Sequence, residues 1–194
     1  MPASRKQDII LAGVGGQGIL SIAFIIDNAA LKEGFQIKQA EVHGMAQRGG
    51  AVQSHLRLSK DRIWSDLIPR GEADIVLSVE PLEALRYLDF LRPEGLVVTS
   101  STPLVNIPDY PDKEKLIGRL REIRGSVIID SEALAKKAGT SKAQNTVMLG
   151  AAAKYLIVTE GSLLEFIRRL FAPRGDKVLE ANLKAFELGR TAAQ

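Results

Sequence analysis

A glycine-rich turn lies between a strand-like and a helix-like segment near the start of the chain, and it limits the fold more than any other motif. Residues 8–14 form a short, largely apolar run, and residues 19–32 carry apolar side chains at helical spacing. Between them lies the sequence GVGGQG, residues 13–18, which matches the pattern G-x-G-x-x-G. Glycine permits the tight turn that a strand-to-helix junction of this kind needs. The start of the chain therefore predicts a β–α unit of an α/β fold.

The alternation of strand-like and helix-like segments continues to about residue 130. A chain of 194 residues lies within the range of one domain, so we expect a single domain over residues 1–194. The pattern indicates a Rossmann-like, mainly parallel sheet with flanking helices and a helical C-terminal part from about residue 141. Further strands are predicted at residues 35–42, 51–58, 74–79, 96–99 and 126–129, and C-terminal helices at 131–137, 145–156, 162–171 and 176–188. Three prolines make residues 102–111 an irregular connection.

The glycine turn is a candidate phosphate site. Backbone N–H groups of such a turn can approach a phosphate, and the N-terminus of the following helix adds positive partial charge. The alternative is that the glycines serve only the close packing of helix on sheet. A nicotinamide dinucleotide would also need an acid at the end of the second strand, where Glu41 lies, so a stand-alone nicotinamide-dependent enzyme or sensor stays open. The candidate cofactor-binding residues of the turn are Gly13, Gly15, Gly16, Gln17 and Gly18.

Residues 41–50, with the sequence EVHGMAQRGG, form a second candidate site. Arg48 can hold a phosphate or carboxylate through two hydrogen bonds, and His43 can donate a proton or anchor a ligand. Gly49 and Gly50 permit close approach of a ligand or of a partner's backbone. A well-capped surface loop with a stray histidine is the alternative, but the density of polar groups favours a site.

The absence of cysteine excludes several kinds of site. Without thiolates the chain cannot ligate an ordinary iron–sulfur cluster or form a disulfide, so a redox centre must belong to a partner or to a bound organic cofactor. The two histidines, His43 and His55, make a zinc site a poor prediction. The net charge of +3 comes from scattered basic residues with 5% aromatics, which disfavours a nucleic-acid-binding module. No apolar run approaches the roughly 18 residues of a membrane span, and we expect a cytoplasmic protein.

Several motifs together resemble one enzyme family. They are GVGGQGIL near the N-terminus, EVHGMAQRGG followed by SHLR, EPLEALRYL, and the later runs NTVMLG and EANLKAF. In these the chain resembles the beta subunit of indolepyruvate ferredoxin oxidoreductase, a family related to the gamma subunits or domains of pyruvate and 2-oxoglutarate ferredoxin oxidoreductases. The resemblance covers nearly the whole chain, and EVHGMAQRGG is its most specific part.

The resemblance implies a reaction and a partner. An aryl pyruvate, coenzyme A and oxidised ferredoxin would give aryl-acetyl-CoA, carbon dioxide and reduced ferredoxin. Thiamine diphosphate and iron–sulfur clusters would belong to a large alpha subunit, in an α2β2 complex, so the present chain would be inactive alone. The loop of residues 41–50 would face that subunit, with His43, Gln47 and Arg48 as candidate catalytic residues and Glu41, Gly49 and Gly50 beside the cofactors. The turn of residues 13–18 would be a candidate for the phosphates of coenzyme A.

Two further polar residues follow predicted elements. Glu80 stands at the carboxyl end of a buried strand, where α/β folds place ligands, although an acid that opens a helix is also favourable capping electrostatics. Asn145 is expected to cap the helix that follows it, and by resemblance it points toward the site.

Overall fold

A mixed sheet of six strands forms the centre of the protein. The computed structural model describes residues 5–43 and 49–193, except for the side chain of His43. The strands lie in the order β2-β3-β1-β4-β5-β6. Their bounds are Lys6–Val14 (β1), Gln36–His43 (β2), Ala51–Ser59 (β3), Ala73–Ser78 (β4), Leu91–Ser100 (β5) and Val127–Ile129 (β6). All six predicted strands are present, and the α/β architecture predicted from the sequence is confirmed.

One reversed strand interrupts an otherwise parallel sheet. β1, β4, β5 and β6 pair in parallel, whereas β3 pairs antiparallel with both β1 and β2. β2 therefore runs in the same direction as β1 but lies two strands away from it. This order departs from a plain Rossmann β–α–β unit, in which the first two parallel strands are neighbours.

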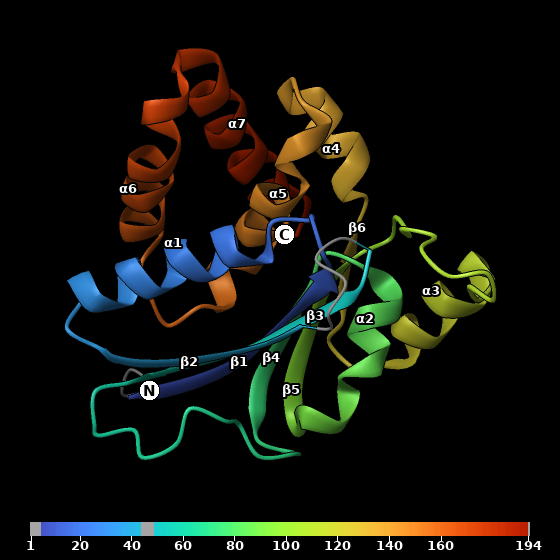
Figure 1. Ribbon diagram of the computed structural model, residues 1–194, viewed down its shortest axis with the longest axis horizontal. Helices are drawn as coiled ribbons and strands as arrows, with labels where there is room; N and C mark the ends of the chain where they lie inside the picture. Colours follow the sequence, from blue (N-terminus) through green and yellow to red (C-terminus); the bar gives the residue numbers. More distant parts are fainter. Residues whose placement is uncertain (1–4, 44–48, 194) are drawn as a thin grey trace.

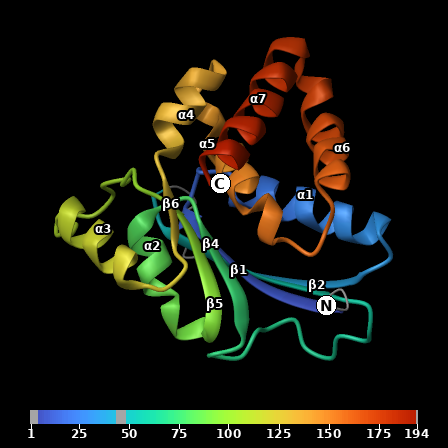
Figure 2. The same ribbon diagram turned by 180° about the vertical axis from the view of Figure 1, so that it is seen from behind.

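Helices cover the two faces of the sheet unequally. α1, α4, α5, α6 and α7 gather over one face, and α2 and α3 pack on the other face beside β4 and β5 (Figures 1 and 2). α5 contacts the sheet, α6 packs on α1, and α7 packs on α5, so the last two helices form a further layer. The bounds are Ile19–Lys32 (α1), Pro81–Arg86 (α2), Lys113–Glu122 (α3), Ser131–Ala138 (α4), Gln144–Ala152 (α5), Glu160–Phe171 (α6) and Asp176–Ala192 (α7). No helix in the described part of the chain combines the length and apolar character needed to cross a membrane.

Apolar side chains from these elements make two cores. The larger core lies between the sheet and the helices α1, α4, α5, α6 and α7. It includes Ile9, Ile22, Leu56 and Phe186. The smaller core lies under α2 and α3 and includes Ile10. Ile9 and Ile10 point to opposite faces because side chains alternate along a strand. A sheet that buries apolar residues on both faces explains why β1 and β4 read as nearly continuous hydrophobic runs.

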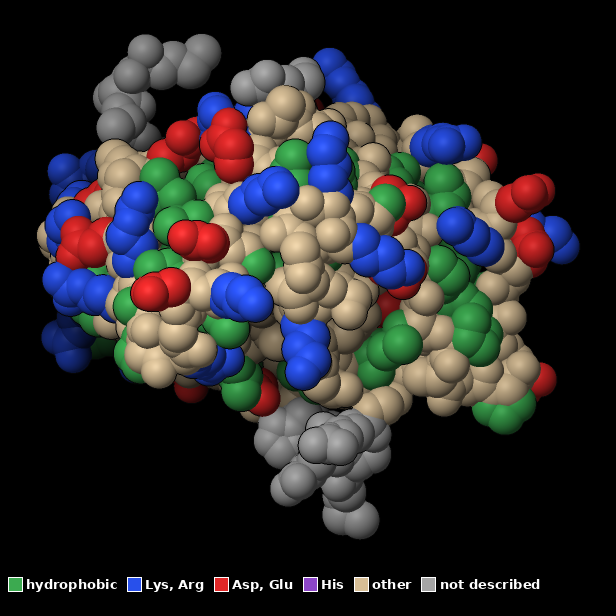
Figure 3. All heavy atoms as spheres, turned by 90° about the horizontal axis from the view of Figure 1, so that it is seen from above, with side chains coloured by type: hydrophobic (Ala, Val, Ile, Leu, Met, Phe, Trp, Pro, Cys, Tyr) green, Lys and Arg blue, Asp and Glu red, His purple; other side chains and the backbone are tan. Residues whose placement is uncertain are grey.

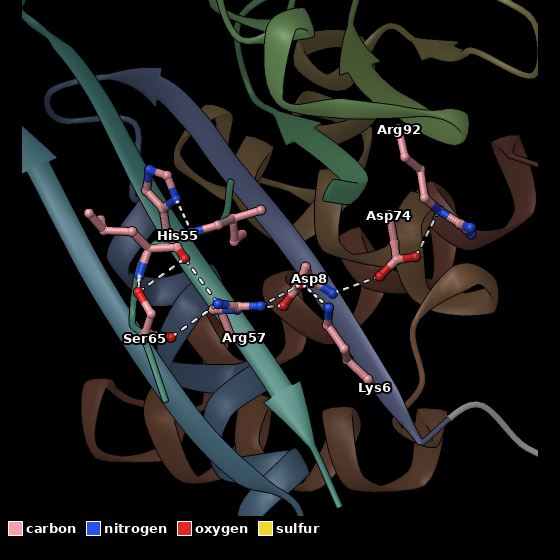
Figure 4. A network of polar contacts seen from close by, with 9 residues as sticks. Lys6, Asp8, His55, Arg57, Ser65, Asp74 and Arg92 are labelled. Carbon is pink, nitrogen blue, oxygen red and sulfur yellow. Dashed lines mark hydrogen bonds and ion pairs between the residues drawn. The ribbon is translucent and has the colours of Figure 1, made fainter. Parts of the chain in front are cut away.

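A network of charged residues closes the end of the sheet opposite the glycine turn (Figure 4). The buried Asp8 carboxylate accepts from Arg57 at 2.9 and 3.1 Å and pairs with Lys6 at 2.8 Å. The Asp8 N–H donates to Asp74, which pairs with Arg92. Every buried charge here has a partner, as burial in low dielectric requires. This network therefore joins β1, β3, β4 and β5, and we assign it a structural role.

His55 belongs to the same structural region and not to the candidate site. Its side chain is buried on β3, its Nδ1 accepts from the Ile68 N–H at 3.0 Å, and its ring meets the Phe90 ring edge-on. Burial, together with the charge of Arg57, lowers the pKa of His55, so the ring stays neutral and can accept that bond. His55 thus anchors the connection between β3 and β4.

Candidate functional site

The carboxyl ends of the parallel strands meet at one edge of the sheet. β1 leads into the glycine turn, β4 into Glu80 and α2, β5 into residues 101–111, and β6 into α4 (Figure 1). The start of β3 reaches the same edge, because the Gly15 N–H donates to the Gly50 carbonyl at 2.8 Å. Open α/β sheets place their ligands at this edge. The structure therefore brings the glycine turn of residues 13–18 next to residues 49–50, the described end of the second predicted loop.

The glycine turn adopts a conformation that glycine favours. Gly16 and Gly18 have φ values of 102° and 80°, in the left-handed region. The Gln17 side chain folds back and accepts from the Val14 N–H at 2.8 Å, which fixes the turn from inside. A Cβ on Gly13 would lie 2.7 Å from Ile19 Cδ1, so close packing of helix on strand accounts for that glycine. Close packing thus accounts for Gly13, and the left-handed backbone accounts for Gly16 and Gly18.

The turn leaves backbone donors at the N-terminus of α1. Gly18 is the N-cap of α1 and has no side chain with which to satisfy the first N–H groups of the helix. The Ser21 N–H donates to the Gly18 carbonyl at 3.0 Å, so the donors left for a ligand are the N–H groups of Ile19 and Leu20, to which the helix dipole gives positive partial charge. The Gly15 and Gln17 N–H groups are already bonded, to Gly50 and Val14. An anion at this turn would therefore meet the first amides of α1 and the region of Gly16.

A basic cavity of about 480 Å³ opens beside these amides. It lies among the turn, the connection after α4, and the starts of α5 and α7. Of the described residues that line it, Lys142, Arg174 and Lys177 are basic and none is acidic. Lys and Arg side chains gather over the middle of the helical face that Figure 3 views from above. Cations around a helix N-terminus make a site suited to phosphate.

A second cavity of about 590 Å³ adjoins the first. Gly16, Gln17 and Lys142 line both cavities, whereas Thr102 and Leu104 form the far wall of the second one. The two cavities together can hold a long ligand with a phosphorylated end. Glu132 is the acidic residue among those that line the second cavity, which makes it less basic than the first.

The predicted loop of residues 41–50 is only partly described. Glu41 is exposed on β2, and His43 is the last residue of that strand. Gln47 and Arg48 lie outside the described residues. At the other end, the Gly49 N–H donates to the Gly15 carbonyl at 3.3 Å, and Gly49 has a φ of 78°. Gly49 and Gly50 thus contact the glycine turn of residues 13–18.

The acid needed by a nicotinamide dinucleotide is not beside the glycine turn. β3 separates β2 from β1, so Glu41 pairs with Ser54, which in turn pairs with Leu11. Two strand spacings of about 4.8 Å separate Glu41 from the strand that bears the turn. The Rossmann arrangement requires this acid on the adjacent strand. The geometry thus disfavours the dinucleotide alternative.

The capping prediction for Asn145 is wrong, and that for Glu80 is confirmed. α5 begins at Gln144, its N-cap is Ala143, and that cap makes no side-chain bond. Asn145 instead lies inside the helix and donates through Nδ2 to the Gly18 carbonyl at 3.2 Å. A tertiary contact thus replaces the local cap. Glu80 caps α2 by accepting from the Glu83 N–H at 2.9 Å.

Sequence reasoning did not mark Lys142, Arg174 or Lys177 as site residues. All three are exposed, and they converge on the glycine turn only because α4 to α7 fold back over α1. More than 120 residues separate the turn from the nearest of them. No local pattern marks such residues, since their role depends on tertiary structure alone.

Comparison with known proteins identifies close relatives. The family model described as pyruvate ferredoxin/flavodoxin oxidoreductase matches residues 8–192. The chain is 39% identical over 196 residues to indolepyruvate oxidoreductase subunit IorB of Methanothermobacter thermautotrophicus, with 96% of this chain and 97% of that subunit covered. It is 38% identical over 205 residues to IorB of Pyrococcus horikoshii, with 98% and 97% covered. The family resemblance of the sequence motifs is confirmed.

Solved structures show the same fold. The 2-oxoglutarate:ferredoxin oxidoreductase of Magnetococcus marinus, with 2-oxoglutarate, coenzyme A and succinyl-CoA bound, matches with a TM-score of 0.75 and 23% identity over 98% of this chain. This chain spans 31% of that longer chain. The pyruvate oxidoreductase subunit PORC of Thermotoga maritima matches with a TM-score of 0.73 and 21% identity, with 97% of each chain covered. At these identities the likeness concerns the fold.

Proposed function

Because the chain belongs to the pyruvate ferredoxin/flavodoxin oxidoreductase family, we propose that it is the small subunit of a cytoplasmic 2-oxoacid:ferredoxin oxidoreductase that acts on aryl pyruvates such as indolepyruvate. The observation that carries this proposal is identity of 36–39% to IorB subunits along nearly the whole chain. The motif EVHGMAQRGG at residues 41–50 supports it.

The proposed reaction requires a partner. An aryl pyruvate, coenzyme A and two oxidised ferredoxins give aryl-acetyl-CoA, carbon dioxide, two reduced ferredoxins and a proton. Thiamine diphosphate supplies the carbanion chemistry and iron–sulfur clusters accept the electrons. By the family resemblance we assign both to a large alpha subunit in an α2β2 complex. For the clusters the chain itself agrees, because it has no cysteine with which to ligate one.

Coenzyme A is the ligand that the described residues suit. Its phosphates would meet the first amides of α1, and Lys142, Arg174 and Lys177 would balance their charge. The second cavity, beyond Gly16 and Gln17, gives the rest of the molecule a path along the edge of the sheet toward the loop of residues 41–50. In this arrangement the chain binds and orients coenzyme A, and the partner activates the 2-oxoacid.

The loop of residues 41–50 would then face the large subunit near the thiamine and the substrate. We propose that Arg48 holds the carboxylate or a phosphate, that His43 handles a proton, and that Gln47 hydrogen-bonds beside them. Glu41, Gly49 and Gly50 would lie near the cofactors. These roles follow from the resemblance and from the chemistry of the residues.

Co-purification of the chain with its partner tests the proposed function. The tagged chain is purified anaerobically from its native host, and the co-eluting protein is assayed for iron, thiamine and ferredoxin reduction. We expect a large partner that carries both cofactors, with faster turnover on indolepyruvate than on pyruvate or 2-oxoglutarate, and no activity from the chain alone. A chain that elutes alone at low salt, or a complex that does not reduce ferredoxin, contradicts the proposal.

A further inference from the structure

A buried carboxylate holds the irregular segment of residues 101–111 in place. Glu80 is 1% exposed, and its Oε1 accepts from the Leu104 N–H at 3.3 Å and from the Tyr110 hydroxyl. Its Oε2 accepts from the Glu83 N–H at 2.9 Å at the start of α2. Burial, followed by the bond to Glu80, raises the pKa of Tyr110, so this hydroxyl stays protonated and donates. One carboxylate thus fixes both halves of the segment to the end of β4.

A further hydrogen bond links the segment to Gly49, which in turn contacts the glycine turn. Asn106 Nδ2 donates to the Gly49 carbonyl at 2.7 Å. Gly49 and its neighbour Gly50 are in turn bonded to Gly15 through the Gly49 N–H and the Gly15 N–H. A path of hydrogen bonds and short stretches of chain therefore runs from the buried Glu80, through the segment, to the glycine turn.

This path connects the two walls of the 590 Å³ cavity. Thr102 and Leu104 line one wall, and Gly16 and Gln17 line the other. A segment without helix or strand has few backbone bonds to fix its position, so side-chain bonds place this wall. Thr102 is held by Ser100 and Asp130, and the Leu104 part of the wall is held by Glu80. Burial of a carboxyl group is costly unless its oxygens are bonded, and the bonds of Glu80 go to this wall and to α2.

We propose that Glu80 and Asn106 are positioning residues that set the separation of the two cavity walls and hence the fit of coenzyme A between them. This inference rests on the proposed function, because it takes coenzyme A as the ligand of the cavity. Neither residue touches the ligand in this account. A wall fixed before binding reduces the ordering that binding would otherwise require.

Two single variants test the inference in the complete complex with the large subunit. Asn106→Ala removes the bond to Gly49, and Tyr110→Phe removes one bond to Glu80 without touching the buried carboxylate. Each should raise the KM for coenzyme A about fivefold, the effect of losing one hydrogen bond, with kcat changed less than about twofold. Val105→Ala is the matched control, since Val105 is 69% exposed in the same segment and should leave both constants unchanged.

The possible results distinguish a positioning role from a general loss of stability. They also distinguish a failure of this inference from a failure of the proposed function. A purely structural role would lower the thermal midpoint of the chain without a selective rise in KM, and that result overturns the inference. An unchanged KM in both variants, or an equal rise in Val105→Ala, does so as well. Lys142→Ala in the same assay reports on the anion site itself. If Lys142→Ala raises the KM and Asn106→Ala does not, the positioning role is wrong and the coenzyme A site stands.

Discussion

Asp27 is a carboxylic acid held in a mostly apolar environment on α1. Its Oδ1 is buried and has no hydrogen-bond partner among the described residues. Burial raises the pKa of Asp27 from 3.8 to about 7, and no neighbouring charge contributes. Leu20, Phe24 and Leu31, which recur at helical spacing around it, are 54%, 43% and 58% exposed. Asp27 therefore costs stability whenever it is ionised.

The pH dependence of unfolding should reveal this cost. Below about pH 3 the carboxyl is protonated in both states and has no differential effect. As pH rises toward 7 the unfolded chain ionises first, so the free energy of unfolding falls and then levels off above the folded pKa. Asp27→Asn should match the wild type near pH 3 and exceed its free energy of unfolding by about 4 kcal/mol at pH 8, in urea denaturation of the isolated chain, because the pKa rises from 3.8 to about 7. Parallel curves for the two proteins would show that Asp27 is not perturbed.

At the level of elements, α5 and α7 pack together through two glycines. A Cβ on Gly150 would lie 2.0 Å from the Phe186 carbonyl oxygen, and one on Gly189 would lie 1.9 Å from the Val147 carbonyl oxygen. Each glycine therefore faces the backbone of the opposite helix. Backbone cannot move aside as a flexible side chain can, so the close approach of the two helices requires glycine at both positions.

Substitution should separate this packing role from helix propensity. Gly150→Ala should lower the free energy of unfolding by about 3 kcal/mol or more, because the added methyl forces α5 and α7 apart. Gly118→Ala, in α3, is the control: a Cβ there meets nothing within 4 Å. Alanine is a better helix former than glycine, so the control should gain about 0.5–1 kcal/mol. Chemical denaturation of both variants measures the difference, and a mild effect at Gly150 would contradict the packing account.

Across the whole molecule, local patterns predicted the six strands and most of the helices, but neither α3 nor the way the elements pack together. Periodicity located the six strands and the glycine turn because alternation and glycine chemistry act over a few residues. The position of β3 between β1 and β2 depends on pairing between distant segments, so the sequence did not predict it. The same holds for Asn145, whose side chain bonds to Gly18, 127 residues away, in place of capping its own helix. Lys142 and Lys177 reach the glycine turn for the same reason.

We propose above that this chain supplies a phosphate site to an enzyme whose redox chemistry belongs to its partner. The most direct test is the KM for coenzyme A of the complete complex with Lys142→Ala and Lys177→Ala combined. Lys184→Ala is the control, an exposed lysine on α7 that does not line the basic cavity. We predict a rise of about tenfold or more for the double variant, diminishing at high salt, with the control and the KM for indolepyruvate unchanged. A KM for coenzyme A that equals the wild-type value would contradict the claim and place the coenzyme A site outside this cavity.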